Sequence, residues 1–223
     1  MTESFDPAYL AATPFVDADH PAIVAYARRV CEGATSQAEK ASRLFRAVRE
    51  HPRYDPYTLT FDRESFRASH VVTQERSYCI PKAVLLAAAA RAAGIGARLG
   101  FADVKNHLAS KKLLEHVGSD VFAWHGYVEL WIEGEPYKVT PAFNEALCAR
   151  FGVPALDLDP VAPADALLQP MDGSGRQYME YIADRGLFVE LPIDEIMQCF
   201  RDHWERVRPS EPVHDEAFHG GDG

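Results

Sequence analysis

The feature that most constrains the fold is an apolar segment that runs from Cys79 to Gly94. Pro81 suits the first turn of a helix, since its fixed φ fits the helix and its missing N–H would be unpaired there. Gly94 supplies the left-handed conformation that ends many helices. Seven alanines between Ala83 and Ala93 leave almost no polar face, and a helix that is apolar nearly all round must be buried on several sides. We therefore predict a central helix covered by other elements.

Cys79 stands at the start of this predicted helix. The first turn of a helix carries unpaired N–H groups and a partial positive charge, and both stabilise a thiolate. We therefore predict that Cys79 is a nucleophile with a lowered pKa, which iodoacetamide would alkylate quickly even below neutral pH. The other cysteines, Cys31, Cys148 and Cys199, are expected to be small apolar side chains and free thiols rather than two disulfides. No C-x-x-C pair indicates a redox motif or a structural zinc site.

Composition and charge exclude several classes of partner. Lys and Arg total 23 against 33 Asp and Glu, which gives a net charge of -10. Such a charge repels polyanions, so we expect neither nucleic acid nor an anionic membrane as a partner. No stretch approaches the ~20 apolar residues of a spanning helix, and we expect a cytoplasmic protein. No metal-ligand spacing or phosphate-binding loop is found, so no cofactor or metal is predicted; the oligomeric state is left open.

The chain length favours one large domain with an elaboration. We predict a core with N-terminal helices over residues 1–147 and a C-terminal elaboration, packed on the same domain, over 148–207. In that second segment, residues 176–182 form a possible strand, and Pro192 opens an amphipathic helix. The polar, Gly-rich residues 208–223 are predicted to be a disordered tail.

Two amphipathic helices are predicted in the N-terminal part. Residues 21–30 read as the first. The second follows the capping-box spacing of Ser36 and Glu39 and cannot continue through Pro52. Its buried stripe comprises Ala41, Leu44, Phe45 and Val48, at helical spacing.

Beyond Gly94 the pattern changes to that of strands. Residues 95–101 and 121–132 are predicted strands, separated by a polar loop with a short helix over 105–118. Gly134 turns the chain into a partner strand over 136–139. Because side chains alternate along a strand, His125 shares one face of residues 121–132 with Tyr127, Glu129 and Trp131.

The order of these elements resembles the transglutaminase-like superfamily of papain-type cysteine enzymes, and residues 54–144 are most similar to bacterial transglutaminase-like proteins. The resemblance rests on Cys79 before the apolar helix, on the Gly94 closure and on the strand of His125 with its Gly134 turn. It implies an α+β core in which the cysteine starts a buried helix packed on an antiparallel sheet that carries the histidine. It also implies a Cys–His–Asp site that hydrolyses or transfers acyl groups at amide bonds.

The sequence departs from this family at the third catalytic position. The family usually has an aspartate in a V-D-P-T-like segment about 15 residues beyond the histidine, and here Thr140 occupies that place. A threonine hydroxyl can accept a hydrogen bond from an imidazole but supplies no negative charge. Asn144 is the alternative partner of His125, with Asp103 and Glu129 as weaker substitutes.

Gln74, Tyr78 and Trp124 are the remaining candidates, for an oxyanion site or for substrate binding. Two hypotheses follow. In the first, Cys79 and His125 act on a peptide, protein or small amide substrate as a hydrolase or acyltransferase. In the second, the chain is a binding module that has lost the charge needed for turnover. An arylamine N-acetyltransferase-like enzyme is disfavoured because its Arg-Gly-Gly run before the cysteine is missing.

Overall fold

A computed structural model describes residues 5–107, 109–158 and 178–204 of the chain. At its centre lies a four-stranded sheet in the order β5-β4-β3-β6, in which each neighbouring pair is antiparallel. The strands of this sheet are β3 (Gly96–Asn106), β4 (Val121–Ile132), β5 (Glu135–Val139) and β6 (Met179–Phe188). A second, parallel pair joins β1 (Arg53–Tyr54) to β2 (Arg76–Ser77).

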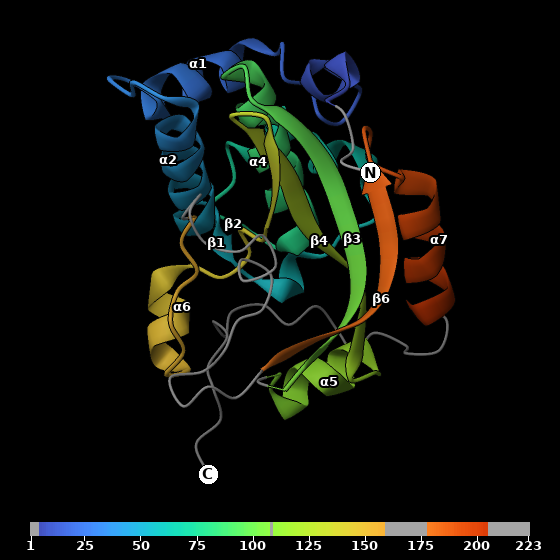
Figure 1. Cartoon of the computed structure of the whole chain (residues 1–223). Helices are drawn as coiled ribbons and strands as arrows, with labels where there is room; N and C mark the ends of the chain where they lie inside the picture. The colour runs from blue at the N-terminus through green and yellow to red at the C-terminus, as the bar shows by residue number, and fades with distance from the viewer. Residues whose placement is uncertain (1–4, 108, 159–177, 205–223) are drawn as a thin grey trace.

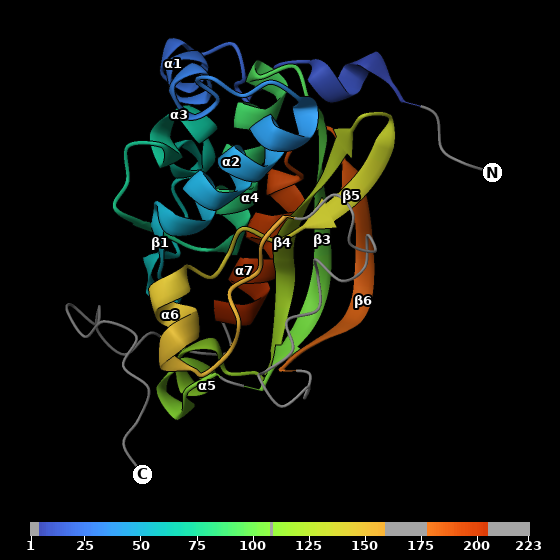
Figure 2. The same ribbon diagram turned by 60° about the vertical axis from the view of Figure 1, so that its left-hand side comes forward.

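The larger helices lie on one face of the main sheet (Figure 1, Figure 2). The α-helices are α1 (Pro21–Val30), α2 (Gln37–Glu50), α3 (Ala68–Val71), α4 (Cys79–Ala92), α5 (Lys111–Val117), α6 (Glu145–Arg150) and α7 (Ile193–Trp204). Three short 3-10 helices are η1 (Pro7–Leu10), η2 (Pro56–Thr58) and η3 (Arg63–Phe66). In this described part no helix combines the length and the apolar character needed to cross a membrane.

Helix α4 is the buried central helix that the sequence predicted. Nearly all of its side chains are buried, and Gly94 follows it at φ 80°. Its core packs on the inward face of β4, where Val128, Leu130 and Ile132 join the same apolar cluster. An α+β core with the cysteine at the start of a buried helix and the histidine on an antiparallel sheet is therefore confirmed.

The N-terminal helices support α4 from the side opposite the sheet. Helix α2 begins as expected, with the Ser36 hydroxyl accepting the Glu39 N–H at 3.1 Å. Fully buried Lys82, in the first turns of α4, donates hydrogen bonds from its Nζ to the backbone carbonyls of Arg49 (3.0 Å) and Pro52. Burial lowers the pKa of Lys82 to about 7, and the partial negative charge at the C-terminal end of α2 offsets part of the cost of burying the cation. This contact ties the start of α4 to the end of α2.

The C-terminal part completes both the sheet and the helical layer. Strand β6 pairs with β3 over most of its length, and α7 buries Ile193, Ile196, Met197 and Phe200 in the cluster around α4. The expected strand over 176–182 and the helix after Pro192 are thus found, with the strand running to Phe188. Helix α6 was not expected. The predicted tail over 208–223 lies outside the described residues, and the division at residues 147 and 148 stays a prediction.

Strand β3 is longer than the sequence indicated. It continues through Val104 into Lys105 and Asn106, the two residues that were expected to start a loop. All three residues pair with β6, and Val104 and Lys105 also pair with β4. Hydrogen-bonding partners from two strands hold polar residues in an extended conformation that their own propensities do not favour.

Candidate active site

Cys79 is the first residue of α4, and its side chain is half-buried. Strand β4 approaches this turn closely at Gly126. A Cβ at Gly126 would lie 3.1 Å from the Cys79 carbonyl oxygen and 3.1 Å from Ile80 Cα. Glycine is therefore needed where the strand meets the helix. The close approach sets His125, the preceding residue, beside the start of α4.

This packing gives a first prediction. Gly126→Ala is expected to destabilise the fold by about 1–3 kcal/mol, because the added methyl group would press against helix backbone that cannot yield easily. Chemical denaturation with a circular dichroism readout measures the loss. An unchanged midpoint would show that β4 and α4 are packed less tightly than described.

Cys79 and His125 line the same cavity, which encloses about 130 Å³. Among the described residues no hydrogen bond joins the two side chains, although they face the same space. The walls come from β1 and the segment after it, α4, β3, α5, β4, the segment between β5 and α6, β6 and α7. The other lining residues are Tyr54, Pro56, Leu59, Tyr78, Ile80, Val104, Asn106, Val117, Val121, Phe122, Ala123, Phe143, Met179, Cys199 and Phe200.

Burial keeps both side chains of the pair neutral. Desolvation raises the pKa of Cys79 to about 11, although hydrogen bonds from the backbone of Gly126, Ile80 and Cys79 itself act in the opposite direction. Desolvation also lowers the pKa of His125 to about 4. The expectation of a lowered cysteine pKa is therefore wrong, because desolvation of the thiolate outweighs the stabilisation by the helix terminus.

The hydroxyl group of Thr140 lies next to the Nε2 nitrogen of His125. Its Oγ1 lies 3.3 Å from His125 Nε2 and donates to the Gly126 carbonyl oxygen at 3.4 Å. A hydroxyl has one proton, so while Thr140 donates it to Gly126, the hydroxyl oxygen accepts the Nε2–H of His125. In that tautomer Nδ1 is the basic nitrogen; in the opposite tautomer the hydroxyl donates to Nε2 at the same distance. Thr140 is therefore the candidate partner that the structure brings to the histidine ring.

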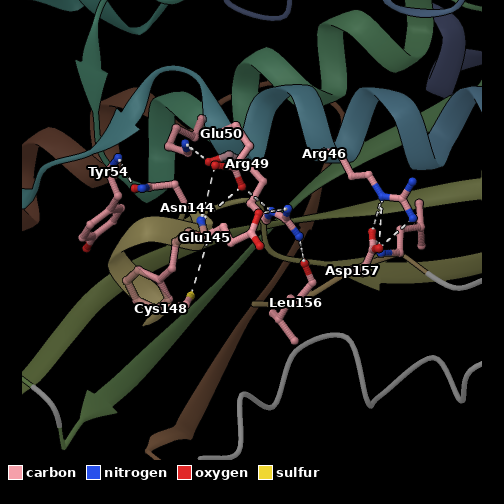
Figure 3. Close-up of polar contacts among 12 residues, drawn as sticks. Arg46, Arg49, Glu50, Tyr54, Asn144, Glu145, Cys148, Leu156 and Asp157 are labelled. Carbon is pink, nitrogen blue, oxygen red and sulfur yellow. Dashed lines mark hydrogen bonds and ion pairs between the residues drawn. The ribbon is translucent and has the colours of Figure 1, made fainter. Parts of the chain in front are cut away.

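Asn144, the alternative partner of the histidine, is engaged elsewhere. Its Oδ1 accepts the backbone N–H of Tyr54 at 3.2 Å (Figure 3). It directly precedes α6, where the backbone N–H of Glu145 donates to Glu50 at 3.1 Å. The side chain of Asn144 thus ties the start of α6 to β1, and the structure does not bring it to His125.

The two weaker substitutes are held in ion pairs. Asp103 receives Arg185 Nε and Nη2 at 2.5 and 2.9 Å and also the Trp124 backbone N–H at 3.1 Å. Glu129 accepts Arg98 Nε at 3.0 Å and Nη2 at 2.6 Å, both side chains being buried. Neither carboxylate contacts His125.

The three candidates for oxyanion or substrate binding are placed differently. Tyr78 lines the cavity, is 6% exposed and directly precedes Cys79; its buried hydroxyl has no hydrogen-bond partner among the described residues. Gln74 donates to the Thr73 hydroxyl at 3.1 Å and does not line the cavity. Trp124 packs against Phe101 and under Arg185, outside the cavity.

Sequence reasoning missed several residues around the pair. Tyr181 on β6 meets the His125 ring edge-on, with ring centroids 6.1 Å apart. Phe143, Met179 and Cys199 line the cavity from segments distant in sequence. No local pattern marks them, since β6 and α7 reach the site only through the sheet order and the packing of the helical layer.

The remaining cysteines and histidines do not form a second centre in the described ranges. All four cysteines are free thiols, and no group of three His, Cys, Asp or Glu side chains there has a metal-binding arrangement. Cys148 is buried as expected, whereas Cys31 and Cys199 are only partly buried. His107 lies 3.5 Å from Glu180 and apart from the cavity.

Known protein families and solved structures resemble parts of this chain. No curated protein sequence matches the chain. The crystal structure of a candidate cysteine protease from Cytophaga hutchinsonii is similar, with 17% identity and a TM-score of 0.48 over 61% of this chain; the match covers 43% of that protein. A family model described as the transglutaminase-like superfamily matches residues 24–140, more than half of the chain. The chain therefore belongs to the transglutaminase-like superfamily.

Proposed function

We propose that this chain is a cysteine-nucleophile enzyme that hydrolyses or transfers acyl groups at amide bonds. The observation that carries the proposal is the shared cavity of Cys79 and His125, with the Thr140 hydroxyl 3.3 Å from Nε2 of the histidine. Acyl transfer by such a site needs a nucleophile, a base close to it and a third group that orients the base. Here these would be Cys79 at a helix start, His125 on a strand and the Thr140 hydroxyl.

The neutral resting pair determines the order of proton transfer. The Cys79 thiol gives its proton to Nδ1 of His125 as the sulfur forms a bond to the substrate carbonyl carbon. The imidazolium then passes this proton to the leaving amine when the carbon–nitrogen bond breaks, and an acyl group remains on the sulfur. Water or a second amine, deprotonated by the same nitrogen, releases the acyl group. Thr140 holds the ring in position throughout.

Two donors are available for the oxygen that becomes negative in this reaction. One is the backbone N–H of Cys79, in the first turn of α4. The other is the unpartnered hydroxyl of Tyr78, which burial keeps protonated by raising its pKa. Both belong to consecutive residues, so one turn of backbone presents the nucleophile and its oxyanion donors together.

The second candidate is a binding module without turnover. Its support is that Thr140 supplies no charge and that burial lowers the pKa of His125 to about 4, which makes the imidazolium costly to form. In this alternative the cavity binds an amide or ester without forming a bond to Cys79.

Stopped-flow hydrolysis of p-nitrophenyl acetate separates the two. The enzyme is expected to release a burst of about one p-nitrophenolate per chain, followed by slower turnover. Cys79→Ala should show no burst, whereas Cys31→Ala, with a partly buried cysteine outside the cavity, should keep it. A burst that survives Cys79→Ala overturns the enzyme proposal, and absence of a burst in the wild type favours the binding module.

A further inference from the structure

The cavity beside Cys79 has walls that are mostly apolar. Aliphatic side chains come from β3, β4, β6 and the loop after β1, and aromatic rings come from Phe122, Phe143 and Phe200. None of the lining residues that the structure describes carries an Asp, Glu, Lys or Arg side chain. A ligand pocket lined in this way binds mainly by burying apolar surface.

The polar groups at this cavity belong to uncharged residue types or to the Cys79–His125 pair; they are Tyr54, Tyr78, Cys79, Asn106, His125 and Cys199. Burial holds His125 in its neutral form with a pKa of about 4 and Cys79 in its thiol form with a pKa of about 11. The Tyr78 hydroxyl is buried without a hydrogen-bond partner among the described residues, so it can donate to one oxygen of a ligand. A few neutral donors and largely apolar walls match a neutral carbonyl group joined to a hydrocarbon.

Charged occupants fit this space poorly. A carboxylate or ammonium group would lose its water without gaining an opposite charge, which costs several kcal/mol. The size of the cavity also limits the occupant. Its volume of about 130 Å³ is close to that of an engineered apolar cavity of about 150 Å³ that binds benzene.

From these observations, and resting on the proposed role of Cys79, we propose that the acyl group taken by this site is apolar, either aliphatic with about six carbons or bearing a phenyl ring. Its carbonyl oxygen meets the Tyr78 hydroxyl, and its hydrocarbon part lies against Phe122, Phe143 and Phe200. A dicarboxylic acyl group is disfavoured, because none of the described lining residues carries a cationic side chain to pair with its carboxylate.

Acylation rates of a series of p-nitrophenyl esters test the proposal. The hexanoate and 3-phenylpropanoate esters should acylate Cys79 at least about 10-fold faster than the acetate, because each buried methylene group adds affinity. The singly charged glutarate monoester should react more slowly than the acetate. Equal rates across the series, or a preference for the glutarate, would overturn the apolar assignment while leaving Cys79 as the acylated residue.

Measuring ligand binding to a variant that cannot react separates this inference from the proposed function. Calorimetry with Cys79→Ala is expected to detect hexanamide and 3-phenylpropanamide but not glutaramate, the singly charged amide of similar length. If these amides bind while no ester acylates the wild type, the enzyme proposal fails and the apolar pocket stands. If neither amide binds, the pocket assignment fails even where acylation occurs.

A cavity-filling variant tests whether the preference for apolar acyl groups arises in this cavity. Ala123 on β4 lines the cavity, whereas Ala183 on β6 is exposed. Ala123→Leu should lower the ratio of hexanoate to acetate rates by about 10-fold, and Ala183→Leu, the same chemical change outside the cavity, should keep the ratio. Thermal unfolding of both variants shows that each is folded. An unchanged ratio of hexanoate to acetate rates in folded Ala123→Leu would contradict the binding of the acyl chain in this cavity.

Discussion

Replacing Thr140 by valine is expected to slow acylation of Cys79 by about 100-fold. Valine has the shape of threonine but no hydroxyl, so the group 3.3 Å from His125 Nε2 would be lost. Without it the imidazole can carry its proton on either nitrogen and can turn within the cavity. The fraction of molecules with a basic Nδ1 facing the thiol should therefore fall. Pre-steady-state kinetics with p-nitrophenyl hexanoate measure the acylation rate directly.

Thr140→Ser is the matched control for this substitution. Serine keeps the hydroxyl and removes only a methyl group, so its acylation rate should stay within about 10-fold of the wild type. Nitrogen-15 NMR of the histidine ring adds a readout that a merely structural role would not affect. The wild type and the serine variant should both show a protonated Nε2. Equal rates for the valine and serine variants would contradict the positioning role of Thr140.

The second large effect is a loss of stability in acid that His125 causes. Burial lowers its pKa from 6.5 to about 4. Between these values the unfolded chain binds a proton that the folded chain does not, so stability falls as the pH falls. The contribution is fully present above pH 6.5 and is lost on approach to pH 4. The difference between the two pKa values corresponds to about 3 kcal/mol.

Urea denaturation at pH 7.0 and pH 4.5 measures this contribution. His125→Gln should reduce the acid-induced loss, because glutamine does not titrate in this range. His70→Gln, a substitution of an exposed histidine at the end of α3, is the control and should keep the loss of the wild type. A His125→Gln variant that loses as much stability in acid as the wild type would show that the ring is more solvated than described.

The central helix and the histidine strand could be predicted from the sequence because each is determined by its own residues. Seven alanines without a polar face require burial of α4, and Pro81 and Gly94 mark its two ends. The alternation along β4 places His125 on one face by strand geometry alone. The capping of α2 by Ser36 is equally local.

The details of the site could not be predicted because they depend on contacts between distant segments. Only three-dimensional packing distinguishes Thr140 from Asn144 as the neighbour of His125. Asn144 accepts a hydrogen bond from the Tyr54 backbone, whereas the Thr140 hydroxyl lies beside His125 Nε2. The expected pKa of Cys79 was wrong for a related reason. A helix terminus can be recognised in the sequence, whereas the desolvation imposed by β4 and the cavity walls can be seen only in the fold.

The most direct test of the cysteine-nucleophile proposal is mass spectrometry of the protein quenched in acid during turnover of p-nitrophenyl hexanoate. Peptide mapping is expected to find one hexanoyl group per chain, attached to Cys79 and removed by hydroxylamine as a thioester would be. Cys31, Cys148 and Cys199 should remain unmodified. Acylation of those cysteines to the same extent, or turnover without any adduct on Cys79, would contradict the assignment of Cys79 as the nucleophile.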